Sequence, residues 1–384
     1  MADRINYQNS ERALQEFLDS CYAVSHSNAT VNGYKNAITG KTKGFRIFLK
    51  ERYDCDEIQL VIRIKSEDLD VYQILKNYVI FLDKSGLMPN SIKQFFHAVK
   101  GYLIHLGVEV YSEKCKQYVK LPKILRRRKE AITKEVLVRI LGVVSFKLRV
   151  VFLVAISSGM RIGEIGGLKL SDIDFGCTPT KIRIRAETTK TREERETFLT
   201  SEATIALKDY LRKYFEWEEI HENTHLKNRN IFGRTSIGKY IRKKNIDEQR
   251  ASVDLLENIL HEQLKKIPEF SGIGENGRRI FHFHALREFF YTTSSNAVGS
   301  NFAHALMGHH SYLDTYYSLS EKEKIKLYQK CEPYLTISDF SKIEEELEKT
   351  KEKQNEIAET YTKLAKFLKQ KDPSFEKFME LIIK

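Results

Sequence analysis

Apolar residues recur three and four positions apart from residue 10 to about residue 110, the spacing that places them on one face of an α-helix. Met88-Pro89-Asn90 interrupts the pattern before its last repeat. This pattern predicts a compact bundle of four or so helices. The apolar stripes comprise Leu14, Phe17 and Leu18; Phe45, Phe48 and Leu49; Tyr72, Leu75, Tyr78, Val79 and Leu82; and Ile92, Phe95, Phe96, Val99, Tyr102 and Leu103.

The pattern changes from Thr133, which is a candidate N-cap for a new helix. Residues 150–156 form a nearly continuous apolar run, as in a helix buried on all sides. Residues 181–186 (KIRIRA) alternate with the period of a β-strand, and residues 196–199 can pair with them across a charged hairpin tip. Helical spacing returns at Ser201. We therefore expect a mainly α-helical domain with one small antiparallel sheet.

The C-terminal tail has a repeat of its own. From Phe340 to Leu368 the spacing alternates between three and four over four heptads, among many Glu and Lys residues. Thr350 and Gln354 are polar interruptions, and Pro373 ends the repeat. The repeat predicts a coiled-coil-like helix. A single surface helix packed on its own domain is the alternative interpretation.

These changes divide the chain into four predicted parts. A helical domain covers residues 1–113, a basic linker 114–132, a second domain 133–337 and a helical tail 338–384. The linker carries four basic residues in succession, Arg126, Arg127, Arg128 and Lys129. Such a run can be a solvated linker. Between two domains of a basic protein, a strap that binds DNA phosphates is the preferred interpretation.

Composition and charge favour a polyanionic partner. The chain has 64 Lys plus Arg against 52 Asp plus Glu, a formal charge of +12 in 384 residues. Its five cysteines lie far apart without a CxxC pair, which favours reduced thiols over a disulfide or zinc framework. No segment reaches the roughly 18 apolar residues of a membrane span. We therefore expect an intracellular, cytoplasmic protein with no membrane partner.

Arg161 stands in SSGMRIGEIGGLKLSDID, directly after the apolar run. Gly159 permits a sharp bend that would bring the arginine to the rim of the core. Glu164, three residues further on, can brace its guanidinium from one side. A second arginine, Arg287, follows His284 by three residues in HALR, so both would share one face of a helix.

The last candidate segment is MGHHSYLDTYY. Gly308 fits the left-handed end of a helix, and His309 and His310 follow it. Adjacent histidines suggest a metal site, but their side chains diverge and no carboxylates stand near at ligand spacing, so no metal ligand is assigned. The available phenols are Tyr316 and Tyr317. Two guanidiniums, two imidazoles and a phenol can together attack a phosphodiester without a metal ion.

In this order and these contexts, the residues resemble those of tyrosine recombinases, the tyrosine-type site-specific integrases. Many bacterial members carry the tyrosine nine residues after the histidine, a position that is Ser318 here. The shorter spacing and the Tyr-Tyr pair look more like archaeal plasmid or virus integrases. Tyr316 is the preferred nucleophile and Tyr317 the alternative.

The resemblance implies a fold, a reaction and a role for each residue. The fold would join a SAM-like helical core-binding domain to a tyrosine-recombinase catalytic domain. DNA would be cut and rejoined through a 3′-phosphotyrosyl intermediate, with no cofactor, metal or ATP. The partners would be double-stranded DNA attachment sites, with a homo-tetramer on DNA and a monomer in free solution. The catalytic residues would be Arg161, Lys190, His284, Arg287, His309 and Tyr316. Lys190 lies at the hairpin tip where the family keeps a mobile lysine, and Lys181 is its weaker substitute.

Three other functions remain open at this stage. A type IB topoisomerase uses similar residues to nick and reseal one strand. A catalytically inactive DNA-binding protein would keep the fold without the reaction. A metal-dependent nuclease would need clustered carboxylates, which the sequence does not offer.

Overall fold

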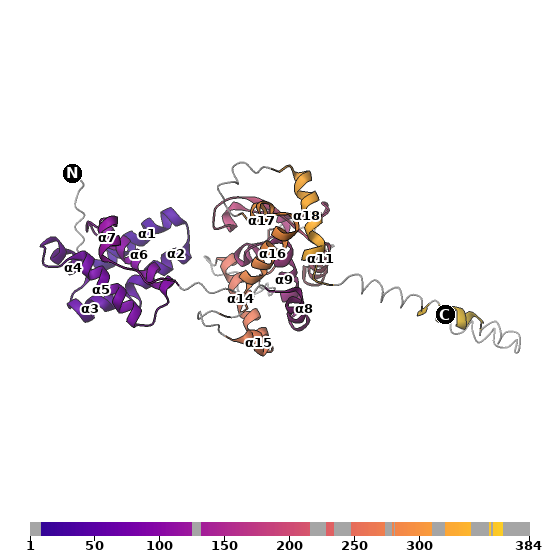
Figure 1. Ribbon diagram of the computed structural model, residues 1–384, viewed down its shortest axis with the longest axis horizontal. Helices are drawn as coiled ribbons and strands as arrows, with labels where there is room; N and C mark the ends of the chain where they lie inside the picture. The colour runs from indigo at the N-terminus through magenta and orange to yellow at the C-terminus, as the bar shows by residue number, and fades with distance from the viewer. Residues whose placement is uncertain are drawn as a thin grey trace. The chain divides into compact units, whose positions relative to one another are not determined.

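The computed structural model describes residues 9–124, 132–215, 228–233, 247–272, 279, 281–308, 319–338, 353–354 and 356–363. The chain forms two compact units, residues 1–129 and 130–384 (Figure 1). Each unit has its own cluster of buried apolar residues. The described residues are mainly helical, with one three-stranded antiparallel sheet. The predicted fold class is confirmed.

The described part of the first unit has seven helices. The four predicted apolar stripes lie on α1, α3, α5 and α6, and their residues fill the first core. The three further helices bury fewer apolar residues: α2, for example, buries Ala37 and Ile38. The helices are α1 (Ser10–Ser25), α2 (Asn28–Thr39), α3 (Phe45–Tyr53), α4 (Glu57–Lys65), α5 (Val71–Lys84), α6 (Pro89–His105) and α7 (Ser112–Tyr118).

Short helices in this unit are held by their ends and by a few polar contacts. Asp56 and Gln59 form a reciprocal capping box at the start of α4. The buried Tyr78 hydroxyl donates to the carbonyl of Ala37, 3.0 Å away, which joins α5 to α2. Cys115 of α7 is buried in the first core, so the beginning of the predicted linker packs as part of this unit. The predicted domain boundaries stay a prediction.

The second unit surrounds one buried helix. The helices that the structure describes in this unit are α8 (Lys134–Val143), α9 (Phe146–Ser158), α10 (Ile162–Gly166), α11 (Ser201–Phe215), α14 (Glu248–Leu264), α15 (Pro268–Ser271), α16 (Phe283–Val298), α17 (Ser300–Met307) and α18 (Glu321–Leu335). The strands are β1 (Ile173–Asp174), β2 (Thr180–Ile184) and β3 (Arg195–Leu199), in spatial order β1-β2-β3. Thr133 caps α8 by accepting from the backbone N–H of Val136, as predicted.

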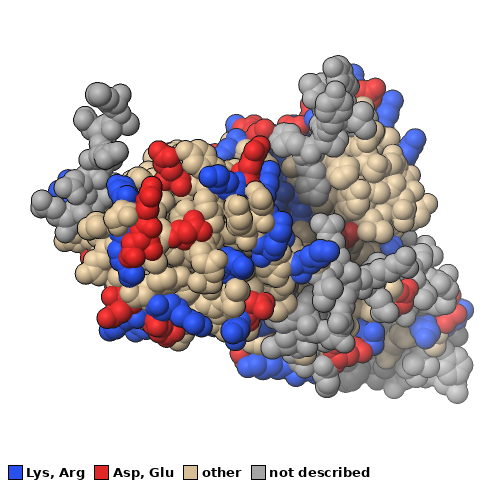
Figure 2. Space-filling model, turned by 60° about the vertical axis from the view of Figure 1, so that its left-hand side comes forward, with Lys and Arg blue, Asp and Glu red and all other residues tan. Residues whose placement is uncertain are grey.

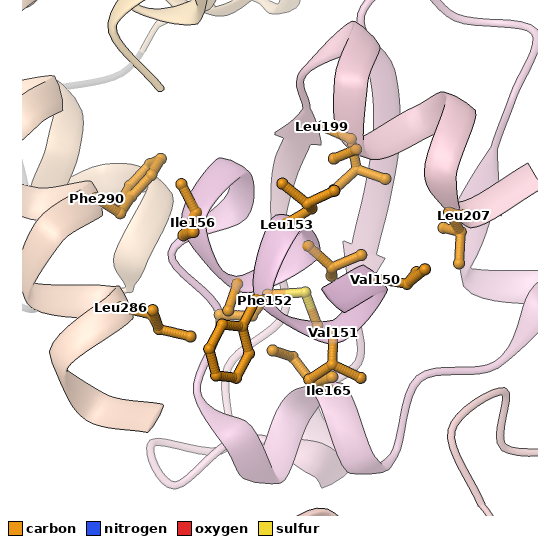
Figure 3. Packing of buried hydrophobic residues seen from close by; sticks show 14 of the residues in the cluster. Val150, Val151, Phe152, Leu153, Ile156, Ile165, Leu199, Leu207, Leu286 and Phe290 are labelled. Atoms are coloured by element: carbon orange, nitrogen blue, oxygen red, sulfur yellow. The ribbon is translucent and has the colours of Figure 1, made fainter. Parts of the chain in front are cut away.

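Helix α9 lies at the centre of this unit (Figure 3). Every residue from Val150 to Ser158 is buried, because α10, α11, α14, α16, α18 and β3 all pack against it. Phe152 contacts the rings of Phe281 and Phe283, each with a centroid separation of 5.7 Å. The predicted helix buried on all sides is confirmed. Its C-terminal end therefore has a fixed position in the core.

Some elements were not predicted. Strand β1 has two residues, too few for a periodic signal, and pairs Ile173 with Ile182 of β2. Helices α14 and α15 lie within residues 218–280, a charged stretch for which no element was predicted. In the tail, residues 356–363 are helical and expose Ile357 and Tyr361. Most of the predicted coiled-coil-like helix lies outside the described residues, so it stays a prediction. Among the described helices, none is long and apolar enough to cross a membrane.

The packing around α9 predicts that truncating a buried side chain of the second unit lowers its stability far more than truncating an exposed one. Phe152→Ala should reduce the free energy of unfolding of the second unit by about 3–5 kcal/mol, because the buried ring is lost and a cavity remains. Ile205→Ala, at an exposed position of α11, should change it by less than about 0.5 kcal/mol. Urea unfolding followed by circular dichroism measures both. Equal losses in the two variants would contradict this account of the core.

Candidate active site

A turn at the end of α9 delivers Arg161 to the surface of the core. Gly159 ends the helix with φ of 64°, and an added Cβ would overlap the ring of Phe290, so only glycine fits there. Arg161 follows as the N-cap of α10. Its backbone N–H donates to Glu164 Oε2 at 2.7 Å, and Nη1 donates to Oε1 at 3.1 Å. The predicted bracing of Arg161 by Glu164 is confirmed.

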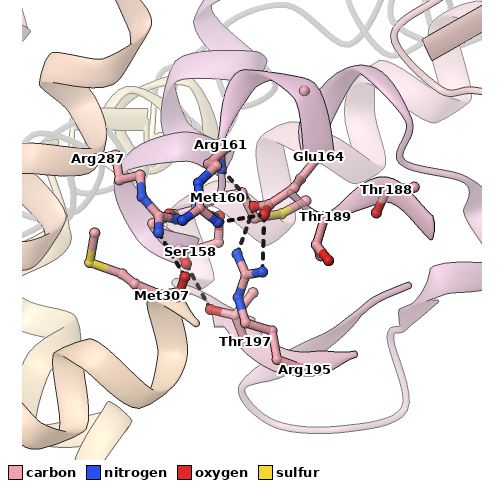
Figure 4. A network of polar contacts seen from close by, with 12 residues as sticks. Ser158, Met160, Arg161, Glu164, Thr188, Thr189, Arg195, Thr197, Arg287 and Met307 are labelled. Atoms are coloured by element: carbon pink, nitrogen blue, oxygen red, sulfur yellow. Dashed lines mark hydrogen bonds and ion pairs between the residues drawn. The ribbon is translucent and has the colours of Figure 1, made fainter. Parts of the chain in front are cut away.

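Glu164 is shared with a second arginine from the sheet (Figure 4). Arg195, the first residue of β3, donates Nη1 to Oε1 at 3.0 Å and Nη2 to Oε2 at 2.6 Å. The carboxylate is only 2% exposed. Burial by itself would raise the pKa of Glu164. The hydrogen bonds and charge of Arg195, together with the backbone N–H of Arg161 and the charge of Arg287, outweigh burial and hold that pKa below its ordinary value. Glu164 is therefore an anion at neutral pH.

Arg287 approaches the same place from α16. It is 1% exposed; Nη1 donates to the carbonyl of Gly159, and Nη2 donates to the carbonyl of Met307 at 2.7 Å. Burial, and then the positive charge of Arg161, lower the pKa of Arg287 to about 9, so it stays charged at neutral pH. Arg287 thus joins the C-terminal ends of α9 and α17.

The three arginines and one carboxylate leave a net charge of +2 in this cluster. Arg161 is its most open member, with a side chain 28% exposed against 8% for Arg195. A cluster with surplus guanidinium charge and an open member can bind a phosphate through charge-assisted hydrogen bonds. The arrangement brings together the two predicted arginines, Arg161 and Arg287.

The loop between β2 and β3 is fixed at its base. Thr189 is buried, and its hydroxyl donates to the carbonyl of Ala186 at 2.9 Å. Gln249 of α14 donates Nε2 to the carbonyls of Gly163 at 2.7 Å and Thr188 at 3.2 Å. It therefore ties α10, which begins beside Arg161, to this loop. Lys190 follows directly and is exposed, so its catalytic role stays a prediction.

Lys181, the weaker candidate, has a different environment. Its Nζ lies 2.7 Å from Glu321 Oε1 and 3.7 Å from Glu196 Oε1. The hydrogen bond with Glu321 raises the pKa of Lys181. These contacts join β2 to the start of α18, so the lysine holds two elements together. Its pairing favours Lys190 as the candidate that is available to a substrate.

His284 and Arg287 lie on one helix but differ in exposure. The His284 side chain is 64% exposed, and its Nε2 lies 3.7 Å from Glu288 Oε1. Arg287, by contrast, points into the core. The two residues were predicted to share one face of the helix, but His284 lies at its solvent edge. Its role as proton acceptor stays a prediction.

Other predicted site residues lie outside the described residues: His309, Tyr316 and Tyr317, and in the linker Arg126, Arg127, Arg128 and Lys129. Gly308, the last described residue before His309, ends α17 with φ of 63°. The predicted left-handed helix end is confirmed.

Residues 130–322 match the family described as "Phage integrase family". The match covers 193 of the 384 residues (322 minus 130 plus 1), which is just over half of the chain, and includes Arg161, Arg195 and Arg287. The chain belongs to the phage integrase family. Members of this family are tyrosine recombinases, so the resemblance seen in the sequence is confirmed. The likeness to archaeal members stays a prediction. A comparison with curated proteins finds no match.

Several solved integrase and recombinase structures are similar to this phage integrase family member. XerH site-specific recombinase, in a post-cleavage complex with a palindromic difH substrate, matches over 84% of this chain and 84% of that chain, with 18% identity and a TM-score of 0.50. A lambda integrase tetramer bound to a Holliday junction matches over 83% of each chain, with 16% identity and a TM-score of 0.48. XerA recombinase matches over 84% of this chain and 98% of its own, with 18% identity and a TM-score of 0.34. At 18% identity, the XerH match shows a shared fold.

Sequence reasoning missed Arg195 and Gln249. It placed Arg195 at the charged hairpin tip, where five charged residues stand among six in 190–195, and no local signal separates one from another. The contact with Glu164 spans 31 positions, so periodicity could not reveal it. Gln249 lies in the charged stretch 218–280, for which no element was predicted.

The cluster predicts binding of a small anion. Inorganic phosphate at ten times its dissociation constant should stabilise the integrase by about 1.4 kcal/mol. The effect should be lost in Arg161→Met and in Arg287→Met, and should weaken above about pH 9 as Arg287 loses its proton. Melting temperatures in phosphate and in chloride at equal ionic strength measure it.

Arg183→Met provides the control, because Arg183 forms an exposed pair with Glu194 on the same sheet, outside the cluster. Equal phosphate stabilisation in the wild type and in Arg287→Met would contradict an anion site at this place.

Proposed function

We propose that this integrase is a site-specific DNA recombinase that cuts and rejoins DNA strands through a 3′-phosphotyrosyl intermediate. The observation that carries the proposal is the pair Arg161 and Arg287, held together with Glu164 at the meeting of α9, α10 and α16. Guanidiniums fixed in advance stabilise charge that develops on a phosphate in the transition state. The chain's net charge of +12 also suits a DNA partner. Figure 2 shows Lys and Arg side chains at many places on the surface in view, interspersed with Asp and Glu.

In the proposed reaction the arginines bind the non-bridging oxygens of the scissile phosphate. Tyr316, or Tyr317 in its place, attacks the phosphorus, and the bond to the 5′ oxygen breaks. A free phenol has a pKa of about 10, so a base must accept its proton, and we assign this role to His284. Lys190 gives a proton to the departing 5′ oxygen, and His309 hydrogen-bonds a phosphate oxygen. A 5′-hydroxyl from another duplex then attacks the phosphotyrosine, which re-forms the DNA backbone and frees the tyrosine.

The proposed partners follow from the relatives. The lambda integrase structure is a tetramer on a Holliday junction, and the XerH structure holds a palindromic DNA substrate. We propose that this chain likewise assembles as a homo-tetramer on double-stranded attachment sites. Residues 126–129 would bind backbone phosphates, which give affinity without sequence information.

A covalent adduct tests the reaction. Nicked duplexes with randomised sequence should trap the wild-type protein on DNA, since the cut strand loses the end that would reseal it. Arg161→Ala and Arg287→Ala should each lower the rate of adduct formation about 10²–10³-fold, because a charge-stabilising donor is removed. DNA binding should be retained. Denaturing gels and sequencing of the trapped DNA provide the measurement, and Arg183→Ala is the matched control.

Three results would point to other functions. Relaxation of supercoiled DNA without recombinant product would favour a topoisomerase. Binding without any adduct would favour an inactive DNA-binding protein. Cleavage abolished by EDTA would favour a metal-dependent nuclease.

The nucleophile can be assigned by substitution. Tyr316→Phe should abolish adduct formation, because the phenylalanine ring has no oxygen to attack phosphorus. Tyr317→Phe should keep it, and the reverse result would assign the alternative residue. Mass spectrometry of the DNA-linked peptide gives an independent measurement. Full cleavage by the double Tyr316→Phe, Tyr317→Phe variant would end the proposal of tyrosine chemistry.

A further inference from the structure

Arg195 lies beside the catalytic candidates without being one of them. Its side chain is 8% exposed, so it is poorly placed to contact DNA. Among the described residues, its hydrogen bonds are internal: two go to Glu164, and one, 2.9 Å long, goes from Nε to the carbonyl of Leu306. The guanidinium therefore spans from α10 to the last turn of α17.

The first consequence is electrostatic. Glu164 pairs with both Arg195 and Arg161, and a carboxylate that neutralised Arg161 alone would weaken its attraction for a phosphate. Arg195 makes the bidentate pair, at 3.0 and 2.6 Å, while the side chain of Arg161 makes one bond of 3.1 Å. Among the groups that lower the pKa of Glu164, Arg195 has the largest effect. With the carboxylate bound in this way, Arg161 keeps further N–H donors for an incoming anion.

The second consequence is mechanical. Arg195 lies against the turn that follows α17, since a Cβ added at Gly308 would stand 2.9 Å from Arg195 Cδ. Arg287 holds the neighbouring carbonyl of Met307. The last turn of α17 is therefore held from two sides, by β3 and by α16. Helix α17 ends at Met307, and Gly308 alone separates it from His309 in the sequence.

We infer that Arg195 is a positioning residue for strand cleavage. It takes up the charge of Glu164 so that Arg161 stays available to the scissile phosphate, and it fixes the helix end that precedes His309. This inference rests on the proposed function. When Arg195 is removed, most of the loss in cleavage rate should come from the charge of Glu164, which then pairs with Arg161 alone.

The experiment is a double-mutant cycle on adduct formation with the nicked duplexes. Arg195→Met should lower the rate constant at saturating DNA about a hundredfold, the scale on which misplaced catalytic groups act. The dissociation constant for DNA should change little, because phosphate contacts elsewhere supply most of the affinity. Glu164→Gln added to Arg195→Met should recover much of the lost rate, because the uncompensated carboxylate is gone. Arg195→Lys, which keeps the charge but not the bidentate geometry, should fall between wild type and Arg195→Met.

Arg183→Met is the matched control, since it removes an arginine that makes a bidentate pair on the same sheet, and its rate should equal that of the wild type. Melting temperatures identify any variant that fails to fold. If Arg195→Met fails to fold, the rate of Arg195→Lys is compared instead with the rate of the Arg195→Lys, Glu164→Gln double variant. A rate within about twofold of wild type for Arg195→Met, or a double variant no faster than Arg195→Met, would overturn the inference.

If the proposed function itself is wrong, the experiment gives a different result. In that case the wild type itself forms no adduct, and phosphate-induced stabilisation becomes the measurement. Arg195→Met should then lose this stabilisation and the double variant should regain it. The same stabilisation in Arg195→Met as in the wild type would overturn the inference.

Discussion

The site depends on one buried carboxylate. Glu164 is 2% exposed and accepts hydrogen bonds from two guanidiniums and a backbone N–H. A buried charge is tolerated only when it is paired and its hydrogen bonds are satisfied, and without the carboxylate three guanidiniums would repel one another across a small space. The carboxylate and the guanidiniums thus offset one another's energetic cost of burial. The surplus of positive charge that remains is what makes the cluster suitable for a phosphate.

The core fixes this cluster before any substrate arrives. Helix α9 is buried from Val150 to Ser158, and its end at Gly159 packs against Phe290, so Arg161 starts from a position that cannot shift freely. Arg287 rises from α16, which packs on α9, and binds the carbonyl of Gly159. Such preorganisation matters because groups that are already oriented need no reorganisation when charge develops on the phosphate.

In the proposed reaction, the rigid and the exposed groups have separate tasks. The arginines that hold the phosphate are anchored in the core, whereas Lys190 and His284, which would move protons, lie at the surface. Gln249 connects the two groups by tying the base of the lysine loop to α10. DNA, which approaches from solvent, would thus meet a fixed anion site bordered by exposed acid and base groups.

Local signals in the sequence determined much of this protein. A continuous apolar run located α9, and helical periodicity located the four predicted stripes of the first unit. The helix ends at Thr133, Gly159 and Gly308 could be predicted because each depends on its neighbours in the chain. Arg161 and Glu164 are three residues apart, so their pairing was readable too. Only the tertiary structure decided that Arg195 completes the pair from 31 positions away, that Gln249 reaches the lysine loop, and that Arg287 is buried while His284 is exposed. Those contacts join elements far apart in sequence, and they are set by how the helices pack around α9, which no local pattern of residues records.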